Sequence, residues 1–163
     1  AFVGVFYNPW LIIIAFFIYM GGMGEYQSTQ MSSALKGIKV KDLMVKDVVT
    51  VSPNDTLEDF EKILIEKRHK GYPVVLDGNV LGIITTNELL SVPRIKWFET
   101  KIQDVMTKDI ITATPNMEVF ELHTKLAEKN LGRAPVIENG RLIGFISKTD
   151  ILKFSEILML KRM

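Results

Sequence analysis

Hydrophobic and polar positions follow two spacings in the middle of the chain, and these spacings predict helices and strands. Apolar residues first recur every three to four positions, as on one face of an amphipathic helix. These residues are Leu57, Phe60, Ile63 and Leu64. Short apolar runs then lie on both sides of Asp77-Gly78, a dipeptide typical of a tight β-hairpin. The expected elements are a strand at 48–51, a helix capped by Asp55 or Thr56, strands at 72–76 and 80–85, and a helix at 87–92.

The same order of elements occurs twice. The stretch from Val40 to Leu90 aligns without a gap with the stretch from Ile102 to Leu152, at a constant offset of 62, the difference between positions 102 and 40. The second copy keeps the helical spacing of apolar residues and has Asn139-Gly140 at its hairpin. A repeat of this kind predicts two similar units whose exposed faces complete one another.

The first 24 residues carry no charged side chain. An apolar stretch of about 20 residues is long enough to cross the hydrocarbon core of a bilayer as a helix. Asn8-Pro9 predicts the start of that helix, as a cap followed by proline in the first turn. Trp10 and Tyr19 flank its aliphatic part, as interfacial aromatic residues do. We therefore expect a transmembrane helix at residues 1–24.

A buried helix of a soluble protein is the alternative, because the run from Pro9 to Met20 is short. Aliphatic and aromatic side chains cover every face of this helix, however, which favours a bilayer over a core on one side only. Lysines at 36, 39 and 41 follow, and basic residues beside a membrane helix predict a cytoplasmic location for the repeats. Residues 25–39 are expected to form a linker helix that ends near Gly37.

Composition narrows the functional classes. The net charge is +1, so no electrostatic argument supports nucleic-acid binding. The absence of cysteine excludes disulfides and thiolate metal sites. His69 and His123 lie far apart and outside any catalytic motif, so we expect no catalytic residue and no metal site within the chain. The sequence starts at Ala1 inside an apolar run, from which we expect a fragment or a processed chain.

Both copies carry recognisable motifs. Each has a TVSP-like start, a PVV or PVI strand, and a GIITTNEL or GFISKTDI segment after the hairpin. In this order the motifs resemble a tandem pair of CBS domains, over residues 40–154. The resemblance implies an α+β fold of two pseudo-symmetric β-α-β-β-α repeats with a cleft between their sheets. It also implies an adenosine ligand (AMP, ADP, ATP or S-adenosylmethionine) that regulates an attached enzyme, channel or transporter.

The expected domains are a transmembrane helix at 1–24, a linker helix at 25–39, CBS repeat 1 at 40–92, a linker at 93–101, and CBS repeat 2 with a C-terminal helix at 102–163. Proteins of the CBS family often pair through the helices that end each repeat. The resemblance therefore implies a homodimer, with contacts at Leu89, Leu90, Ile151 and Leu152.

The segment Gly144–Asp150 carries groups suited to a nucleotide. Ser147 stands where a strand ends and a helix begins, and the free N–H groups of a helix N-terminus favour a phosphate. Thr149 adds a hydroxyl, and an ionised Asp150 can accept hydrogen bonds from both hydroxyls of a ribose. Ser-x-x-Asp is also a capping box that needs no ligand. The CBS resemblance favours the ligand, because Gly-x-x-Ser/Thr-x-x-Asp is similar to that family's ribose-phosphate motif.

Two unequal nucleotide sites are expected, with the tighter one at Asp150. The first copy has Glu88 where the family has Asp, and Gly71 where the second copy has Arg133. Arg133 is a candidate phosphate contact, although a charged residue at a solvated turn is the simpler interpretation. The residues expected at the tighter site are Thr50, Thr112, Arg133, Ala134, Pro135, Ser147, Thr149 and Asp150. Those expected at the weaker site are Lys70, Tyr72, Pro73, Thr85 and Glu88.

The segment NPWLIIIAFFIYMGGMGEYQ, followed by lysines and the CBS-like pair, resembles the C-terminal end of a site-two-type intramembrane zinc metalloprotease. That resemblance implies a catalytic His-Glu-x-x-His motif upstream, which would hold zinc there and not within this chain. We therefore expect a membrane-anchored module that senses adenosine nucleotides and regulates such a protease. Two alternatives stay open: a ligand-free dimerisation module, and a regulatory domain of a membrane transporter or channel.

Overall fold

The computed structural model describes residues 9–161 of the chain. The predicted helix cap at Asn8 lies outside the described residues, and Pro9 is the first residue of the first helix, as expected. In chain order the elements are α1 (Pro9–Leu35), α2 (Val40–Leu43), α3 (Leu57–Lys67), β1 (Gly71–Leu76), β2 (Asn79–Thr85), α4 (Thr86–Leu90), the 3-10 helix η1 (Arg94–Lys96), α5 (Ile102–Val105), α6 (Val119–Glu128), β3 (Arg133–Glu138), β4 (Arg141–Ser147) and α7 (Lys148–Lys161).

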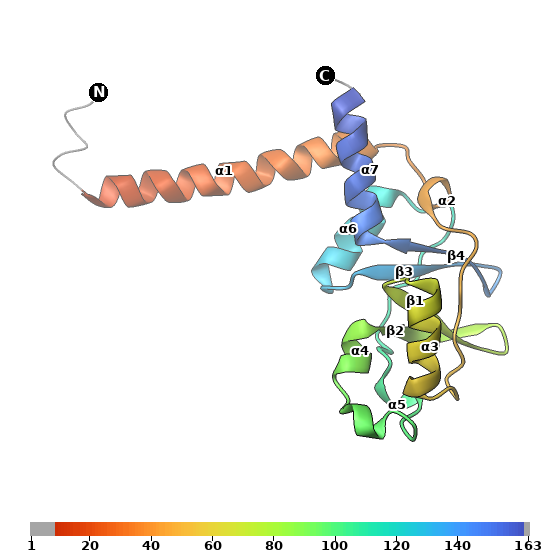
Figure 1. Cartoon of the computed structure of the whole chain (residues 1–163). Coiled ribbons are helices and arrows are strands. Elements are labelled where there is room, and N and C mark those ends of the chain that lie inside the picture. Colours follow the sequence, from red (N-terminus) through yellow and green to blue (C-terminus); the bar gives the residue numbers. More distant parts are fainter. Residues whose placement is uncertain (1–8, 162–163) are drawn as a thin grey trace.

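Two antiparallel hairpins, β1–β2 and β3–β4, form the centre of the molecule (Figure 1). Both turn residues have positive φ in each hairpin, 51° and 83° at Asp77-Gly78 and 51° and 77° at Asn139-Gly140. This geometry follows the right-handed twist of the strands and favours Asn, Asp and Gly. A β-bulge between Val74 and Val75 recurs between Val136 and Ile137, so the repeats share their irregularities as well as their order.

The predicted first strand of each repeat is reduced to one bridge residue. Val51 lies parallel to Val74. The Val51 N–H donates to the Pro73 carbonyl at 3.1 Å, and the Val51 carbonyl accepts from the Val75 N–H at 2.9 Å. Ala113 makes the equivalent parallel bridge in the second repeat. The predicted order strand, helix, strand, strand, helix is therefore present, with the first strand at its minimum length.

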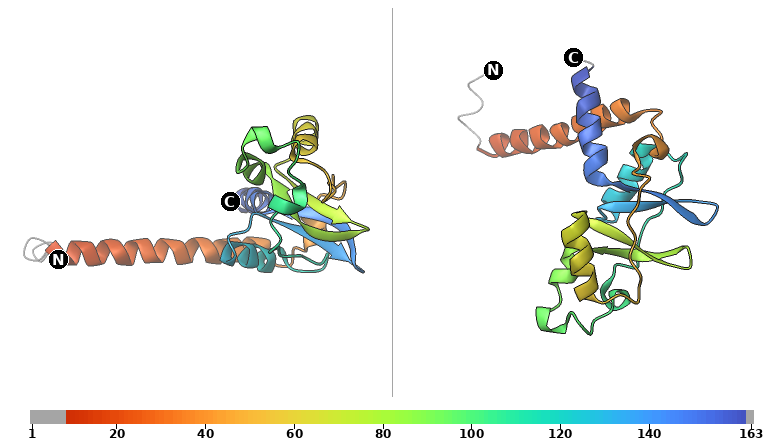
Figure 2. Two further views of the ribbon diagram at one scale, coloured as in Figure 1. Left: turned by 90° about the horizontal axis from the view of Figure 1, so that it is seen from below. Right: turned by 45° about the vertical axis from the view of Figure 1, so that its right-hand side comes forward.

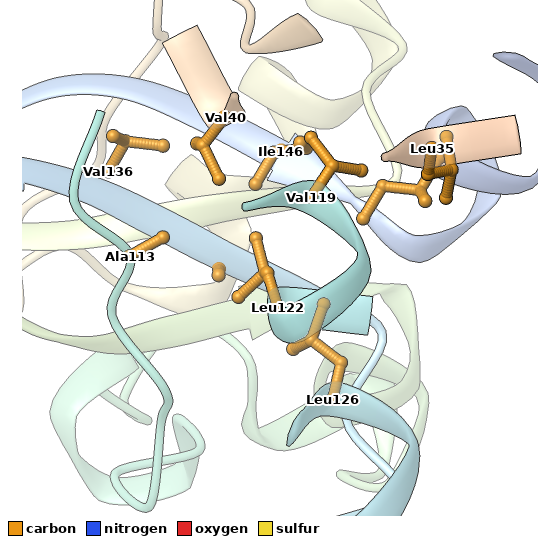
Figure 3. Close-up of a cluster of buried hydrophobic side chains, with 10 residues drawn as sticks. Leu35, Val40, Ala113, Val119, Leu122, Leu126, Val136 and Ile146 are labelled. Carbon is orange, nitrogen blue, oxygen red and sulfur yellow. The ribbon is translucent and has the colours of Figure 1, made fainter. Parts of the chain in front are cut away.

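Each repeat is completed by a segment that precedes the other repeat. Val40, in α2, is fully buried in the same hydrophobic cluster as Leu122 and Ile146 of the second repeat (Figure 3). Ile102, in α5, is fully buried in the cluster of the first repeat, which contains Phe60. The repeat alignment places both residues at the start of the repeat that follows them in sequence. The two cores are thus exchanged between the halves, which leaves neither half complete without the other.

Backbone hydrogen bonds hold the two crossing segments against the opposite sheet. Val45 exchanges a pair of N–H···O bonds, each of 2.9 Å, with Phe145 in β4. Thr107 exchanges an equivalent pair, of 2.9 and 3.0 Å, with Ile83 in β2. These bonds satisfy backbone groups on the edge strand of each hairpin, which would otherwise be exposed to solvent or to another chain.

Two glycines at equivalent positions permit this close crossing. An added Cβ at Gly82 would lie 2.6 Å from the Thr107 carbonyl oxygen, and one at Gly144 would lie 2.5 Å from the Met44 sulfur. At Gly82 the contact is with backbone, so a larger residue would push the crossing segment off the sheet. At Gly144 the Met44 side chain could move aside, and the nearest backbone atom is the Val45 carbonyl oxygen at 3.1 Å, so a larger residue there would be tight against the crossing segment. The shared glycine of the repeat alignment therefore has a packing cause.

Helix α1 joins the predicted membrane helix and the predicted linker helix into one continuous element. Its C-terminal end packs against α6 and α7, where Ala34 and Leu35 are buried, and the chain turns at Gly37 with φ +80°. Its N-terminal part extends away from the repeats (Figure 2). The large apolar side chains from Trp10 to Tyr19 are 46–70% exposed.

Across residues 9–161, no helix combines the length and the apolar character that crossing a bilayer requires. The predicted transmembrane helix at residues 1–24 is therefore not supported by the fold, and its first eight residues lie outside the described part.

The expected dimer contacts need correction at two positions. Leu89 is 2% exposed and Ile151 is fully buried, and each belongs to the hydrophobic core of its own repeat. They therefore cannot contact a second copy of the chain. Leu90 and Leu152 are exposed, because adjacent residues of a helix point to different faces.

Candidate functional site

Strand β4 ends at Ser147 and helix α7 begins at Lys148, so the polar groups of the Gly-x-x-Ser-x-x-Asp motif lie at this junction. The Ser147 hydroxyl donates to Asp150 Oδ2 at 2.5 Å and accepts from the Asp150 N–H at 3.1 Å. This is part of the capping arrangement that needs no ligand. Asp150 is exposed, and among the described residues its Oδ1 has no hydrogen-bond donor. One carboxylate oxygen is therefore available to a ligand.

The motif opens into a cavity of about 300 Å³ that both repeats line. The lining residues are Val45, Asp47, Val48, Val49, Arg68, His69, Lys70, Gly71, Arg133, Phe145, Ser147, Thr149, Asp150 and Lys153. Ligand sites of proteins commonly begin at about this volume and combine apolar surface with a few polar groups. Val45, Val48, Val49 and Phe145 supply the apolar surface here.

The charged part of the lining is mainly positive. Its cationic residues are Arg68, Lys70, Arg133 and Lys153. Its carboxylates are Asp47 and Asp150. A partly enclosed cavity with excess positive charge raises the local concentration of anions. An anionic ligand with an apolar ring and a donor for Asp150 matches this lining.

Arg133 is the most enclosed of these cations. Burial lowers the pKa of its guanidinium, and attraction to Glu88 and Asp150 opposes that shift. Within residues 9–161 its side chain forms no ion pair shorter than 4.0 Å. An added Cβ at Gly71 would lie 2.8 Å from Arg133 Nε, so the guanidinium arm lies directly against the Gly71 backbone. A half-buried cation without a close counterion is suited to receive one from a ligand.

The structure brings together only part of the expected tighter site. Arg133, Ser147, Thr149 and Asp150 line one cavity, and Lys70, which the sequence analysis assigned to the weaker site, lines the same cavity. Thr50 lines a second cavity of about 350 Å³, with Lys46 and Arg141 among its neighbours. Thr112 lies among the lining residues of neither cavity. Ala134 and Pro135 are buried in β3, and Ala134 belongs to the core of the second repeat.

The residues expected at the weaker site are mostly occupied with holding the fold together. The hydroxyl of the fully buried Tyr72 accepts from the His69 N–H at 3.1 Å, and Pro73 is buried beside it in β1. Thr85 and Glu88 form a capping box at the start of α4, with Glu88 Oε2 accepting from the Thr85 N–H at 2.8 Å. Glu88 Oε1 accepts from the Thr107 hydroxyl at 3.0 Å. Both oxygens of this carboxylate therefore have protein donors.

Several lining residues were not anticipated from the sequence. They are Val45, Asp47, Val48, Val49, Arg68, Gly71, Phe145 and Lys153. Two of them carry a local signal. Phe145 lies two positions before Ser147 and so on the same face of its strand, and Lys153 lies about one helical turn after Asp150. The residues before Thr50 carry no such signal, because the crossing of the segments is not encoded locally.

Comparison with known proteins gives a family for this arrangement. The sequence model of the CBS domain matches residues 40–94 and 102–157. Zinc metalloprotease MJ0392 of Methanocaldococcus jannaschii is 34% identical over 154 residues, which are 94% of this chain and 43% of the relative. Inosine-5'-monophosphate dehydrogenase of the same organism is 35% identical over 117 residues, 71% of this chain and 23% of that enzyme. The chain spans about two fifths of the length of the first three curated relatives, at 43%, 40% and 43%.

Solved structures share the fold. The CBS domain pair of protein MJ0100, in complex with 5'-methylthioadenosine and S-adenosyl-L-methionine, has a TM-score of 0.65 and 26% identity, and the match covers 77% of this chain and 98% of that one. A putative acetoin utilization protein from Vibrio cholerae has a TM-score of 0.67 and 25% identity, with 77% and 95% covered. The family match, the two exchanged repeats and these neighbours agree, and the chain belongs to the CBS domain family as a tandem pair with an α+β fold.

Proposed function

We propose that the chain is a regulatory module that senses an adenosine nucleotide in the cavity at Asp150. One observation carries this proposal: a single cavity combines an available carboxylate oxygen, an apolar surface and four cations. A ribose can donate to the Asp150 carboxylate, an adenine ring can pack on the valines and Phe145, and phosphate can pair with the cations. The complex of the MJ0100 pair with two adenosine compounds supports the same ligand class.

Calorimetric titration of the full chain with AMP, ADP, ATP, S-adenosylmethionine and 5'-methylthioadenosine tests this function. We expect saturable binding of at least one of them with a Kd of about 1–100 μM, that is, about −5.5 to −8 kcal/mol. The 2'-deoxy form of the bound compound is the control. Because it lacks the 2'-hydroxyl, it cannot donate that hydrogen bond to the Asp150 carboxylate, and it should bind more weakly. No binding of any adenosine compound would overturn the proposal.

A ligand-free dimerisation module is the second candidate, and exposed apolar residues on the helices that end each repeat favour it. These residues are Leu90, Leu152, Ile157 and Leu160, at 39–71% exposed. They give a homodimer an apolar contact whether or not a ligand binds. Sedimentation during the same titration separates the candidates, because a dimer that ignores every adenosine compound would leave dimerisation as the function.

We further propose that the module is attached to a membrane through α1, with the repeats on the cytoplasmic side. The exposed apolar residues of α1 support attachment, since water is an unfavourable environment for them. Lys36, Lys39 and Lys41 follow the helix and support the cytoplasmic side. The 34% identity to a zinc metalloprotease supports such a protease as the regulated protein, with its zinc and catalytic residues outside this chain, and a transporter or channel as the alternative.

Fractionation tests the attachment. The full chain should stay with the membranes after a carbonate wash, whereas a variant with Ile14→Glu and Phe17→Glu should be released, because both residues are exposed and a charge in the hydrocarbon region is costly. Full release of the unaltered chain would refute the attachment. A matched variant with Leu90→Glu and Ile95→Glu, on exposed residues of the first repeat, should remain with the membranes.

A further inference from the structure

The cations of the Asp150 cavity are not shared by the equivalent positions of the other repeat. At the constant offset of 62, Arg68, Lys70 and Lys153 correspond to Asn130, Gly132 and Ser91. The matching bulges show that the two hairpins are equivalent in space as well as in sequence. The left-handed φ shared by Arg68 (56°) and Asn130 (53°) extends this equivalence to the turn before each hairpin. Both repeats thus have a carboxylate at the equivalent of Asp150, but only the Asp150 side has cations at these three positions.

Arg133 adds a fourth positive charge to the Asp150 cavity, and the other repeat has no cation at the equivalent position. The equivalent position in the first repeat is Gly71. Because Gly71 has no side chain, the Arg133 side chain can fill the space beside it; a Cβ at Gly71 would lie 2.8 Å from Arg133 Nε. Two arginines at these positions could not both occupy that space. One cation therefore stands near the centre of the pair, where it is attracted by both Glu88 and Asp150.

The carboxylates differ in a way that follows from the crossing segments. Glu88 Oε1 accepts from the Thr107 hydroxyl at 3.0 Å. The position equivalent to Thr107 is Val45, which has no hydroxyl and contributes apolar surface to the cavity. Asp150 consequently keeps an oxygen for a ligand, while Glu88 has none to offer without breaking a bond within the protein.

The loop that presents the cations of the first repeat is held in place. Arg68 caps α3 in the left-handed conformation, with φ 56°, and its N–H donates to the Leu64 carbonyl at 3.0 Å. The Tyr72 hydroxyl accepts from the His69 N–H at 3.1 Å. Across the cavity, Lys153 follows Asp150 on α7. Cations on two walls, one of them anchored, suit an anion with several charged groups better than a single phosphate.

We propose that the Asp150 cavity selects adenosine ligands with two or three phosphates, and that each chain binds only one of them because the equivalent position at Glu88 lacks the cations and the free carboxylate. This selectivity rests on the proposed nucleotide-sensing function and names its ligand class. Arg68 and Lys153 are specificity residues that contact the outer phosphates, and Asp150 holds the ribose.

The test compares AMP with ATP by calorimetry on the full chain in low salt with EDTA, so that free nucleotides are the ligands. ATP should bind at least about tenfold more tightly than AMP, with one site per chain. Arg68→Asn and Lys153→Ser introduce the residues of the other repeat, and Asn suits the left-handed cap because Asn130 has φ 53°. Each substitution should weaken ATP binding about three- to tenfold and AMP binding less than about twofold. In the double variant the affinities for ATP and AMP should differ by less than about threefold.

Lys161→Ser is the matched control, because it removes an exposed charge from the same helix outside the cavity. It should leave the ATP-to-AMP ratio unchanged. Equal affinity of the unaltered chain for AMP and ATP would overturn the selectivity and leave nucleotide sensing in place. The assignment to Arg68 and Lys153 would be overturned if the double variant still preferred ATP. It would also be overturned if Lys161→Ser abolished the ATP preference as fully as the double variant does. Two ATP molecules per chain would overturn single occupancy, and no binding at all would overturn the proposed function itself.

Discussion

Ile102→Ala is expected to lower the free energy of unfolding by about 2–5 kcal/mol, the range for truncating a fully buried isoleucine to alanine. Ile102 is fully buried in one cluster with Phe60, Tyr72 and Trp97. Its N–H also donates to the Asp55 carbonyl at 2.9 Å, which anchors α5 on the first repeat. The loss should therefore appear in the first repeat, although the repeat alignment places Ile102 at the start of the second.

Denaturant unfolding measures the total loss, and hydrogen exchange locates it. Amides of β1 and β2 should lose protection at least as strongly as those of β3 and β4. Ile95→Ala is the control, because Ile95 is 80% exposed and its truncation should change the stability by less than about 0.5 kcal/mol. A loss below about 1 kcal/mol, or one confined to β3 and β4, would contradict the exchanged core.

Asp150→Ala is expected to weaken nucleotide binding at least about tenfold, whereas Glu88→Ala should change it less than about threefold. Hydrogen bonds from a ribose to a carboxylate contribute roughly 1.5–3 kcal/mol each, and about 1.4 kcal/mol corresponds to one decade in Kd. Glu88 has protein donors on both oxygens. Its removal should instead lower the free energy of unfolding by about 1 kcal/mol, since it uncaps α4.

The two variants therefore separate affinity from stability, and calorimetry combined with thermal unfolding measures both. Asp150→Asn sharpens the comparison, because the amide can still accept from the Ser147 hydroxyl while the charge is gone. It should bind nucleotide with an affinity between those of the unaltered chain and Asp150→Ala. If Glu88→Ala costs more affinity than Asp150→Ala, the ligand lies on the opposite side of the pair.

Local patterns predicted the hairpins because the determining residues are adjacent. Asp77-Gly78 and Asn139-Gly140 supply positive φ values at the turns, and the alternating runs beside them supply the strands. The strands expected at 72–76 and 80–85 differ from β1 and β2 by one residue at their first ends. The helix cap was also local, and of the two candidates Thr56 provides it, accepting from the Asp59 N–H at 3.2 Å.

The site was only partly predictable because its two walls come from different repeats. A repeat alignment shows which positions are equivalent, but it does not show on which half a segment packs. Lys70 was therefore expected beside Glu88 and instead lines the cavity of Asp150. The valines before Thr50 were missed for the same reason. Val45 is held against the second repeat by its backbone pairing with Phe145, a contact between residues 100 positions apart in sequence, the difference between 145 and 45.

The exchanged segments also impose an order on synthesis. As the chain leaves the ribosome, the first repeat can close its core as soon as Ile102 has emerged, shortly after its own last helix. Val40 emerges earlier but finds its partners only when Ile146 has been made. At ordinary translation rates of about 5–20 residues per second, that wait lasts roughly 5–20 s. Until then α2 leaves an apolar residue uncovered on the nascent chain, and synthesis of the second repeat is what completes the core around it.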